Sequence, residues 1–249
     1  MMGDETRDAI WRQYDLAFRE DAHQLLAWGH LDSCRLITPQ QEETEITGFI
    51  VEAIQSRLDS FTTPARFEKY CVKEDNPVSG EGRTGKKRRR IDIIIEATRP
   101  RPRPRYVFEA KRLCRPSNTI GKYVGSEGMM RFISGRYAAE CPEVAMIGYV
   151  QTDTAEYWFA ELENHFSKDS AEGLYITAKL TQVSVTADLK DAWVSRHTRK
   201  SGNQLAIFHV LLNCSAQANE IGLNDGNQGR SRRRRMPGLR TEWRRTSDA

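Results

Sequence analysis

The chain has 249 residues, of which 39% are hydrophobic, enough for one large α/β domain with an ordinary core and too many for a disordered or fibrous protein. Its longest apolar runs, 91–95 and 205–212, are interrupted by polar residues and fall short of the roughly 20 residues of a membrane helix. The acidic start of the sequence argues against export, and five scattered cysteines without a Cys-x-x-Cys pair indicate reduced thiols. We therefore expect a cytoplasmic protein that does not enter a membrane.

Positive charge is concentrated in two places. The formal net charge is +4, but residues 83–105 carry +8 and residues 230–249 carry +6, which leaves −10 for the rest of the chain. This distribution suits a polyanion, most commonly nucleic acid, whereas the alternative is a solvated loop and a solvated tail. From about Leu223 the sequence has too few apolar residues to pack. We predict a single domain over 1–222 and a basic, disordered tail over 223–249.

Helical periodicity marks the first part of the chain. Residues 4–28 predict one or two amphipathic helices. A further helix is predicted to begin at Thr38, with Pro39 in its first turn and Gln41 completing a capping box, and to run to about Ser60. Its apolar stripe consists of Ile46, Phe49, Ile50, Ala53, Ile54 and Leu58.

A hairpin with charged residues on one face is predicted next. The β-branched segments RIDIIIEA at 90–97 and YVFEAKRL at 106–113 are typical of strands, and the prolines of TRPRPRPR between them belong to the connection. Antiparallel pairing centred near Arg101 places Asp92 almost opposite Glu109, and strand alternation puts Glu109 and Lys111 on the same face. Two carboxylates and an amine therefore converge.

Helices and strands alternate in the remaining sequence. Residues 119–139 predict a helix weakened by glycines, and 144–151 predict a buried strand. Asp153 and Glu156 open another helix, further strands are predicted within 174–186 and 204–212, and a short helix is predicted near 188–195. The expected fold is α/β, with a mixed central sheet flanked by helices.

The hairpin cluster predicts a particular chemistry. Adjacent carboxylates repel, and a hard cation such as Mg²⁺, which prefers oxygen ligands and keeps several waters, suits one or two carboxylates plus a substrate phosphate. Lys111 would orient or deprotonate the attacking water, or stay charged and stabilise the transition state. These are the parts of metal-assisted phosphodiester hydrolysis. The alternative is a surface salt bridge between Lys111 and Asp92 or Glu109.

An acid-bearing helix, a strand with Asp, a strand with Glu-x-Lys and a following helix resemble the PD-(D/E)xK superfamily of restriction-endonuclease-like nucleases. The resemblance covers about 38–151, and Ile91 stands where the family has proline. It implies a restriction-endonuclease-like core and an endonuclease that uses Mg²⁺ or Mn²⁺ in restriction or anti-phage defence. The metal ligands that it implies are Asp92, Glu109 and the carbonyl of Ala110.

Other candidate residues carry less information. Helix geometry favours Glu43, then Glu42, as the helical acid, although acids in a first turn also complement the helix dipole. His197 and His209 match no metal or catalytic spacing, and Asp188-Leu189-Lys190 has no upstream strand acid, so these residues are expected to be structural. The predicted contacts to phosphate are Lys86, Lys87, Arg88, Arg89, Arg90, Arg101, Arg103 and Arg131.

Several readings of the function stay open at this stage. DNA is favoured over RNA as the substrate, but no residue pattern separates an RNase from a DNase. A nucleic-acid-binding module with structural carboxylates keeps the same fold without the chemistry. A homodimer, or a subunit of a larger defence or repair complex, is also compatible with the sequence.

Overall fold

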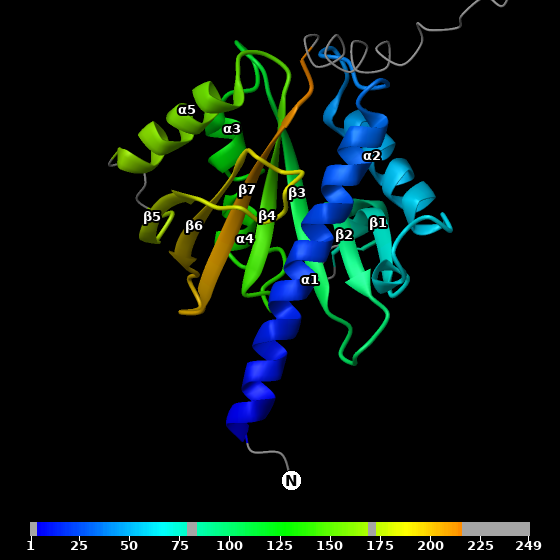
Figure 1. Ribbon diagram of the computed structural model, residues 1–249. Helices are drawn as coiled ribbons and strands as arrows, with labels where there is room; N and C mark the ends of the chain where they lie inside the picture. The colour runs from blue at the N-terminus through cyan, green and yellow to red at the C-terminus, as the bar shows by residue number, and fades with distance from the viewer. Residues whose placement is uncertain (1–3, 79–83, 169–172, 216–249) are drawn as a thin grey trace, which may run out of the picture.

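Seven strands form one mixed sheet that is covered by helices on both faces (Figure 1). The computed structural model describes residues 4–78, 84–168 and 173–215, so the predicted tail at 223–249 lies outside the described residues. The sheet order is β1-β2-β3-β4-β7-β6-β5. The strands are β1 (Tyr70–Pro77), β2 (Arg90–Ala97), β3 (Arg105–Leu113), β4 (Glu143–Val150), β5 (Ile176–Gln182), β6 (Ala192–Thr198) and β7 (Gln204–Asn213). The predicted α/β class and mixed central sheet are confirmed.

The central strands are parallel and the two edges are antiparallel. β3, β4 and β7 run parallel to one another, while β1 and β2 extend the sheet on one side and β6 and β5 extend it on the other, each antiparallel to its neighbour. Central strands that are buried on both faces read as continuous apolar runs, as β4 and β7 do. This pattern made both strands recognisable in the sequence.

Two hydrophobic cores lie on opposite faces of the sheet. The first contains side chains of the long helix α1 (Asp4–Ser33) and of α2 (Glu43–Leu58), including Leu25 and Ile50, packed on Phe108. The second contains α3 (Ile120–Val124), α4 (Met130–Ile133) and α5 (Ala155–Ser167), including Phe132 and Trp158, packed on Val107. None of the described helices has the length and apolar character that crossing a membrane requires.

Helices α1 and α2 cross at very short range. A Cβ atom at Gly29 would lie 2.8 Å from the carbonyl oxygen of Ile50 and 2.6 Å from a side-chain carbon of Ile54. Only a glycine allows this approach without a shift of α2. The contact fixes α2 against the sheet and so fixes where its first turn, which carries Glu43, meets the strands.

The predicted start of the second helix is wrong by one turn. α2 begins at Glu43, and Glu45 accepts a hydrogen bond from the backbone N–H of Glu42 at 2.8 Å, so Glu42 and Glu45 form the capping arrangement. The side chain of Gln41 instead accepts the backbone N–H of Thr38 at 2.7 Å and closes a separate turn. Glu45, three residues after Glu42, supplies the capping contact that Gln41 was expected to supply one turn earlier.

The continuous helix predicted over 119–139 is also wrong. The structure has two short helices, α3 and α4, because Gly125 has extended backbone angles that end α3. A Cβ atom at Gly128 would lie only 2.1 Å from the carbonyl oxygen of Tyr123, so the turn depends on glycine at that position.

Two further differences concern strands. The helix predicted near 188–195 is absent, because Ala192 and Val194 face one core and Trp193 the other, and this alternation builds β6. The edge strand β1 was not predicted, since its outward face is charged and only Tyr70 and Val72 pack inward.

Candidate functional site

The two acids of the hairpin meet at the end of the β2–β3 ladder. The register pairs Glu96 with Arg105 and Ile93 with Phe108, so Asp92 and Glu109 are the next positions and face each other, as the sequence predicted. The backbone N–H of Ala110 donates a hydrogen bond to Oδ2 of Asp92 at 2.7 Å. This bond holds the Asp92 carboxylate against β3.

Lys111 joins the strand acids to helix α2. Its Nζ donates to Oε1 of Glu43 at 2.7 Å, lies 3.2 Å from Oε1 of Glu109 and also donates to the carbonyl oxygen of Ala110. Glu42 points elsewhere, because its exposed carboxylate pairs with Arg112 at 2.9 Å. The structure thus brings Glu43, and not Glu42, to the hairpin acids.

Glu109 is fully buried, and its two oxygens differ. Oε1 contacts Arg131, on α4, and Lys111. Oε2 is buried and has no hydrogen-bond partner in the described part of the chain. A buried polar atom without a partner is costly, so such an atom calls for an explanation.

Burial sets the protonation of the two acids. It raises the pKa of Asp92 to about 6, against the opposing effects of Lys111 and the Ala110 hydrogen bond. Burial, and then the charge of Asp92, raises the pKa of Glu109 to about 8. Raised carboxyl pKa values in a cleft beside a specific charge partner are typical of functional sites.

Lys111 keeps its charge in this environment. Burial lowers its pKa, but the carboxylates of Glu109, Glu43 and Asp92 together outweigh burial, so the pKa of Lys111 is raised. The ammonium group is therefore a fixed positive charge between three acids.

The cluster opens into a polar cavity of about 510 Å³. Half of the predicted basic residues lie there, because Arg88, Arg89 and Arg90 line the cavity and Arg131 reaches into it. Lys86 is exposed next to this segment, and the side chain of Lys87 lies outside the described residues. The cavity therefore combines buried acids with a cationic rim.

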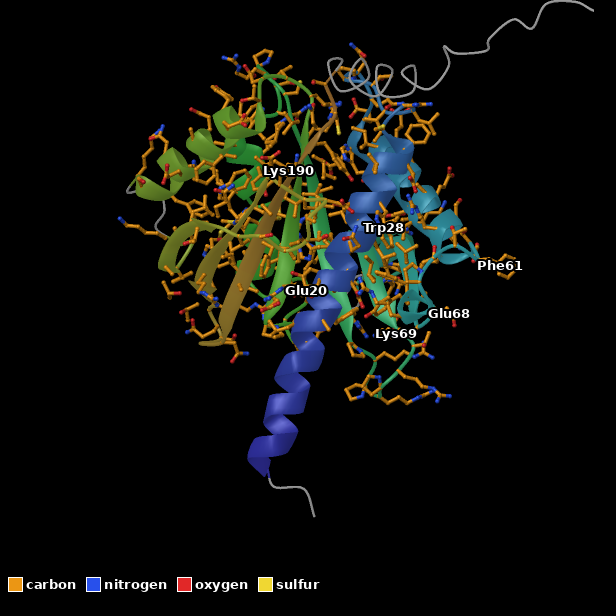
Figure 2. The ribbon with its side chains drawn as sticks, viewed as in Figure 1. Glu20, Trp28, Phe61, Glu68, Lys69 and Lys190 are labelled. Carbon is orange, nitrogen blue, oxygen red and sulfur yellow. The ribbon has the colours of Figure 1, made fainter. Side chains whose placement is uncertain are left out.

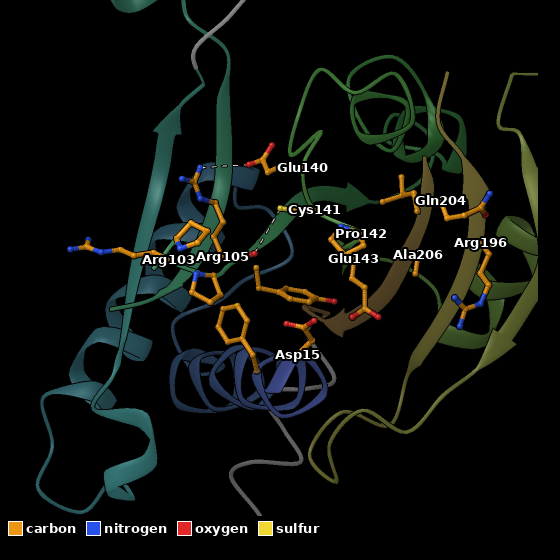
Figure 3. Close-up of a pocket in the computed structure, with 15 residues that line it drawn as sticks. Asp15, Arg103, Arg105, Glu140, Cys141, Pro142, Glu143, Arg196, Gln204 and Ala206 are labelled. Atoms are coloured by element: carbon orange, nitrogen blue, oxygen red, sulfur yellow. Dashed lines mark hydrogen bonds and ion pairs between the residues drawn. The ribbon is translucent and has the colours of Figure 1, made fainter. Parts of the chain in front are cut away.

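The other predicted basic residues lie at the far end of the hairpin. Arg101 belongs to the β2–β3 connection and Arg103 lines a different cavity of about 620 Å³, at the start of β3, β4 and β7 (Figure 3). That cavity is larger, but Asp92, Glu109 and Lys111 do not line it. The length of β2 separates 99–105 from the acids, and the phosphate contacts of Arg101 and Arg103 stay a prediction.

Sequence reasoning missed two residues of the site. Glu127 pairs with Arg131 one turn away, and Tyr137 donates a hydrogen bond to the carbonyl oxygen of Arg90 at 2.6 Å while its ring lies 5.0 Å from the Arg131 guanidinium. The spacing of Glu127 and Arg131 is a helical ion-pair signal that could have been read. Tyr137 reaches Arg90 through a tertiary contact that no local sequence pattern signals.

The protein supplies only some of the oxygen ligands that a hard cation needs. No three His, Cys, Asp or Glu side chains within 4–78, 84–168 and 173–215 form a group that could hold a metal ion. The oxygens that converge are the carboxylates of Asp92 and Glu109 and the carbonyl of Ala110, and Oε2 of Glu109 is without a partner. Two carboxylates plus a carbonyl, completed by waters and a phosphate, are what Mg²⁺ accepts. The residues present fit the ion.

The other candidates have structural surroundings. Ser195 Oγ lies 2.7 Å from Nε2 of His197 and 2.8 Å from Nε2 of His209, all fully buried, and burial lowers the pKa of His209 to about 3. The carboxylate of Asp188 accepts a hydrogen bond from Gln24 at 2.6 Å and caps no helix.

Comparison with known proteins gives no relative. No protein-family model, no curated protein and no solved structure matches the chain.

Proposed function

We propose that the protein is a divalent-metal-dependent nuclease of the PD-(D/E)xK type, with a restriction-endonuclease-like core, that hydrolyses phosphodiester bonds. The observation that carries the proposal is the convergence of Asp92, Glu109 and Lys111 at one end of the β2–β3 ladder, with a buried Glu109 oxygen that has no partner among the described residues. Glu43 on the preceding helix and the following parallel strand β4 stand in the order that the resemblance implies.

Asp92, Glu109 and the Ala110 carbonyl would hold Mg²⁺ or Mn²⁺. Such an ion supplies a Lewis acid and a bound water of lowered pKa. The raised pKa values of the two acids fit this role, because a nearby cation favours the charged carboxylates and offsets the cost of their burial.

The chain's own cations act on the phosphate. Lys111, held by Glu43 at 2.7 Å, keeps its charge, which favours its role in stabilising the developing negative charge over the role of a base. Arg131 and the cavity arginines Arg88, Arg89 and Arg90 neutralise the phosphate backbone as it enters. Glu127 and Tyr137 orient the Arg131 guanidinium.

The preferred substrate in this proposal is DNA, and the setting is restriction or anti-phage defence in the cytoplasm. Cutting both strands of a duplex needs two such sites or two successive cuts. A homodimer or a larger assembly is therefore part of the proposal.

The test incubates purified protein with supercoiled plasmid and with single-stranded RNA, in Mg²⁺, in Mn²⁺ and in chelator. We expect cleavage that requires metal and disappears in Glu109→Gln and in Lys111→Met. Lys190→Met is the matched control, because Lys190 belongs to an acid-x-Lys tripeptide outside the site.

The outcomes separate the candidate functions. Cleavage of RNA alone would make the protein an RNase. Metal-independent binding without cleavage of either substrate, unchanged in Lys111→Met, would replace the proposal with a non-catalytic nucleic-acid-binding module.

A further inference from the structure

The β2–β3 connection places a second group of cations away from the acid pair. Asp92 and Glu96 are four positions apart along β2, a span of about 13 Å at roughly 3.3 Å per residue. Beyond Glu96 lies the connection, in which arginines alternate with prolines. We call these cations, together with Lys73 of β1, the tip cluster; its members are Lys73, Arg99, Arg101, Arg103 and Arg105.

A buried carboxylate organises the tip cluster. Glu96 is 8% exposed, and its oxygens contact Lys73 and, at 3.9 Å, Arg103. The hydrogen bond from Lys73 holds the pKa of Glu96 below its usual range. The cations themselves reach water, since the side chains of Lys73, Arg103 and Arg105 are 45%, 46% and 51% exposed. Glu96 thus holds the charged ends of Lys73 and Arg103 in place, while about half of each side chain stays open to water.

Basic residues outnumber the acids that are seen to contact the tip cluster in the described part of the chain. Lys73 and Arg103 contact Glu96, and Arg105 lies 3.8 Å from Glu140, so two acids stand against three of the five cations in the cluster. Figure 3 shows Arg105 turned towards Glu140 and Arg103 extended away from the cavity that it borders. Lys69, labelled in Figure 2, lies at the same end, where its carbonyl oxygen accepts the N–H of Thr98. An excess of exposed, partly ordered cations suits a phosphate backbone.

Protein fills the space between the two groups. Ile94 and Val107, midway along the hairpin, are 4% and 1% exposed and belong to the same core as Phe132 and Cys141. A small phosphate compound therefore cannot touch both the tip cluster and the acid pair. A polymer can.

We propose that the tip cluster is a second phosphate-binding site, which holds the backbone of a polynucleotide about four base pairs from the acid pair, on one side of it. This spacing follows from the ~13 Å span of β2 and the rise of about 3.4 Å per base pair. The inference rests on the proposed function for the position of the cut, and it adds that the substrate is a polynucleotide whose contacts extend farther to one side than to the other.

The first experiment measures binding in chelator, so that cleavage plays no part. The affinity for a fluorescent duplex of about 30 base pairs is followed against salt for the full chain and for Arg99→Gln/Arg101→Gln/Arg103→Gln, whose changes lie on an exposed loop. Each contacted phosphate contributes about 0.9 to the slope of log affinity against log salt, so we expect the slope to fall by about 2 to 3.

A matched variant shows whether place or charge alone matters. Lys179→Gln/Lys190→Gln/Lys200→Gln removes three exposed lysines from β5 and the loops beside it, and Figure 2 shows Lys190 on the other side of α1 from Lys69. We expect its salt slope to stay within about 0.5 of the full chain's. Equal slopes in the tip variant and the full chain, or equal losses in both variants, would overturn the second site.

The second experiment locates the contact along the substrate. A neutral methylphosphonate linkage is moved along one strand, and binding and cleavage are measured at each position. We expect a loss of binding on one side only, about four linkages from the cut, which disappears in the tip variant. Binding loss without any cleavage would contradict the nuclease and support the tip site. Cleavage that is insensitive to distant linkages would support the nuclease and contradict the tip site.

Discussion

The two ends of the β2–β3 hairpin use the same residue types for different purposes. At one end Glu96 meets Lys73 and Arg103, and its pKa is lowered by the hydrogen bond from Lys73. At the other end Glu109 meets Lys111 and Arg131, and its pKa is raised to about 8. An acid that contacts two basic residues therefore does not by itself indicate a functional site.

A second acid beside a fully buried one makes the difference. Glu96 is surrounded by cations that remain exposed and solvated, which is the ordinary arrangement of a surface ion pair. Glu109 is fully buried opposite Asp92, and one of its oxygens has no partner among the described residues. The protein accepts the cost of a fully buried acid opposite a second carboxylate at one end only, and such a cost is usually found where it serves a function.

The largest contrast is expected for cleavage by isosteric amide variants at the two ends. Asp92→Asn removes a charge from the proposed metal site, and we expect the cleavage rate at saturating substrate to fall by about 10³-fold or more. Glu96→Gln should change that rate by less than about threefold, because Glu96 acts on binding. Gel quantification of plasmid cleavage in Mg²⁺ measures both. Similar losses in the two variants would mean that any change in the hairpin lowers the cleavage rate, and would contradict a specific role for Asp92.

Arg131→Gln should have the next largest effect. Its guanidinium contacts Glu109 and Glu127, so its loss removes a positive charge next to the proposed metal ligand Glu109. We expect a fall of about 10²-fold in the cleavage rate, in the range seen when one transition-state contact is removed. Arg112→Gln is the control, because Arg112 pairs with the capping Glu42. A full rate in Arg131→Gln would make this residue a structural partner of Glu109 only.

The hairpin could be predicted from sequence because its determinants are local. Prolines at 100, 102 and 104 fix the connection, and strand alternation then decides that Asp92 faces Glu109 and that Lys111 shares its face. Glu43 followed from helix phase alone, even though the helix begins one turn later than predicted, because a shift of the N-terminus leaves the phase of the following residues unchanged.

The rest of the site depends on contacts that a local pattern does not encode. A continuous helix over 119–139 does not predict where the side chain of Arg131 lies, because the turn at Gly128 sets the position of α4. The separation of Arg101 and Arg103 from the acids follows from the antiparallel hairpin itself, and it could have been deduced from the same pairing that brought Asp92 to Glu109.

Stability should respond to pH with opposite signs at the two ends. Between about pH 4.5 and 8 the folded protein holds a proton on Glu109 that the unfolded chain releases, so this group makes stability fall as pH rises, by at most about 1.4 kcal/mol per pH unit. Glu109→Gln removes this dependence and should gain stability relative to the unaltered protein as pH rises. Glu96 has a lowered pKa and stabilises the fold above its unfolded pKa.

Urea unfolding at pH 4, 6 and 8 in chelator checks both signs. Glu96→Gln should be less stable than the unaltered protein at pH 6 and 8, and the difference should shrink as pH falls through the lowered pKa of Glu96. Adding Mg²⁺ at pH 8 should stabilise the unaltered protein and not Glu109→Gln. Stability curves of the two variants that run parallel across this range would contradict the assignment of one buried and one solvated cluster.

The smallest effects should separate two neighbouring acids. Glu43 holds the Lys111 ammonium, so Glu43→Gln should lower the cleavage rate by roughly three- to tenfold, because the hydrogen bond survives and the charge is lost. Glu42 occupies the N-cap of α2 and pairs with Arg112, so Glu42→Ala should cost about 1 kcal/mol of stability and leave the rate within about twofold. Measured on both variants, the cleavage rate should therefore be lower in Glu43→Gln, and the unfolding free energy should be lower in Glu42→Ala. If Glu42→Ala slows cleavage more than Glu43→Gln does, the acid that completes the site is Glu42.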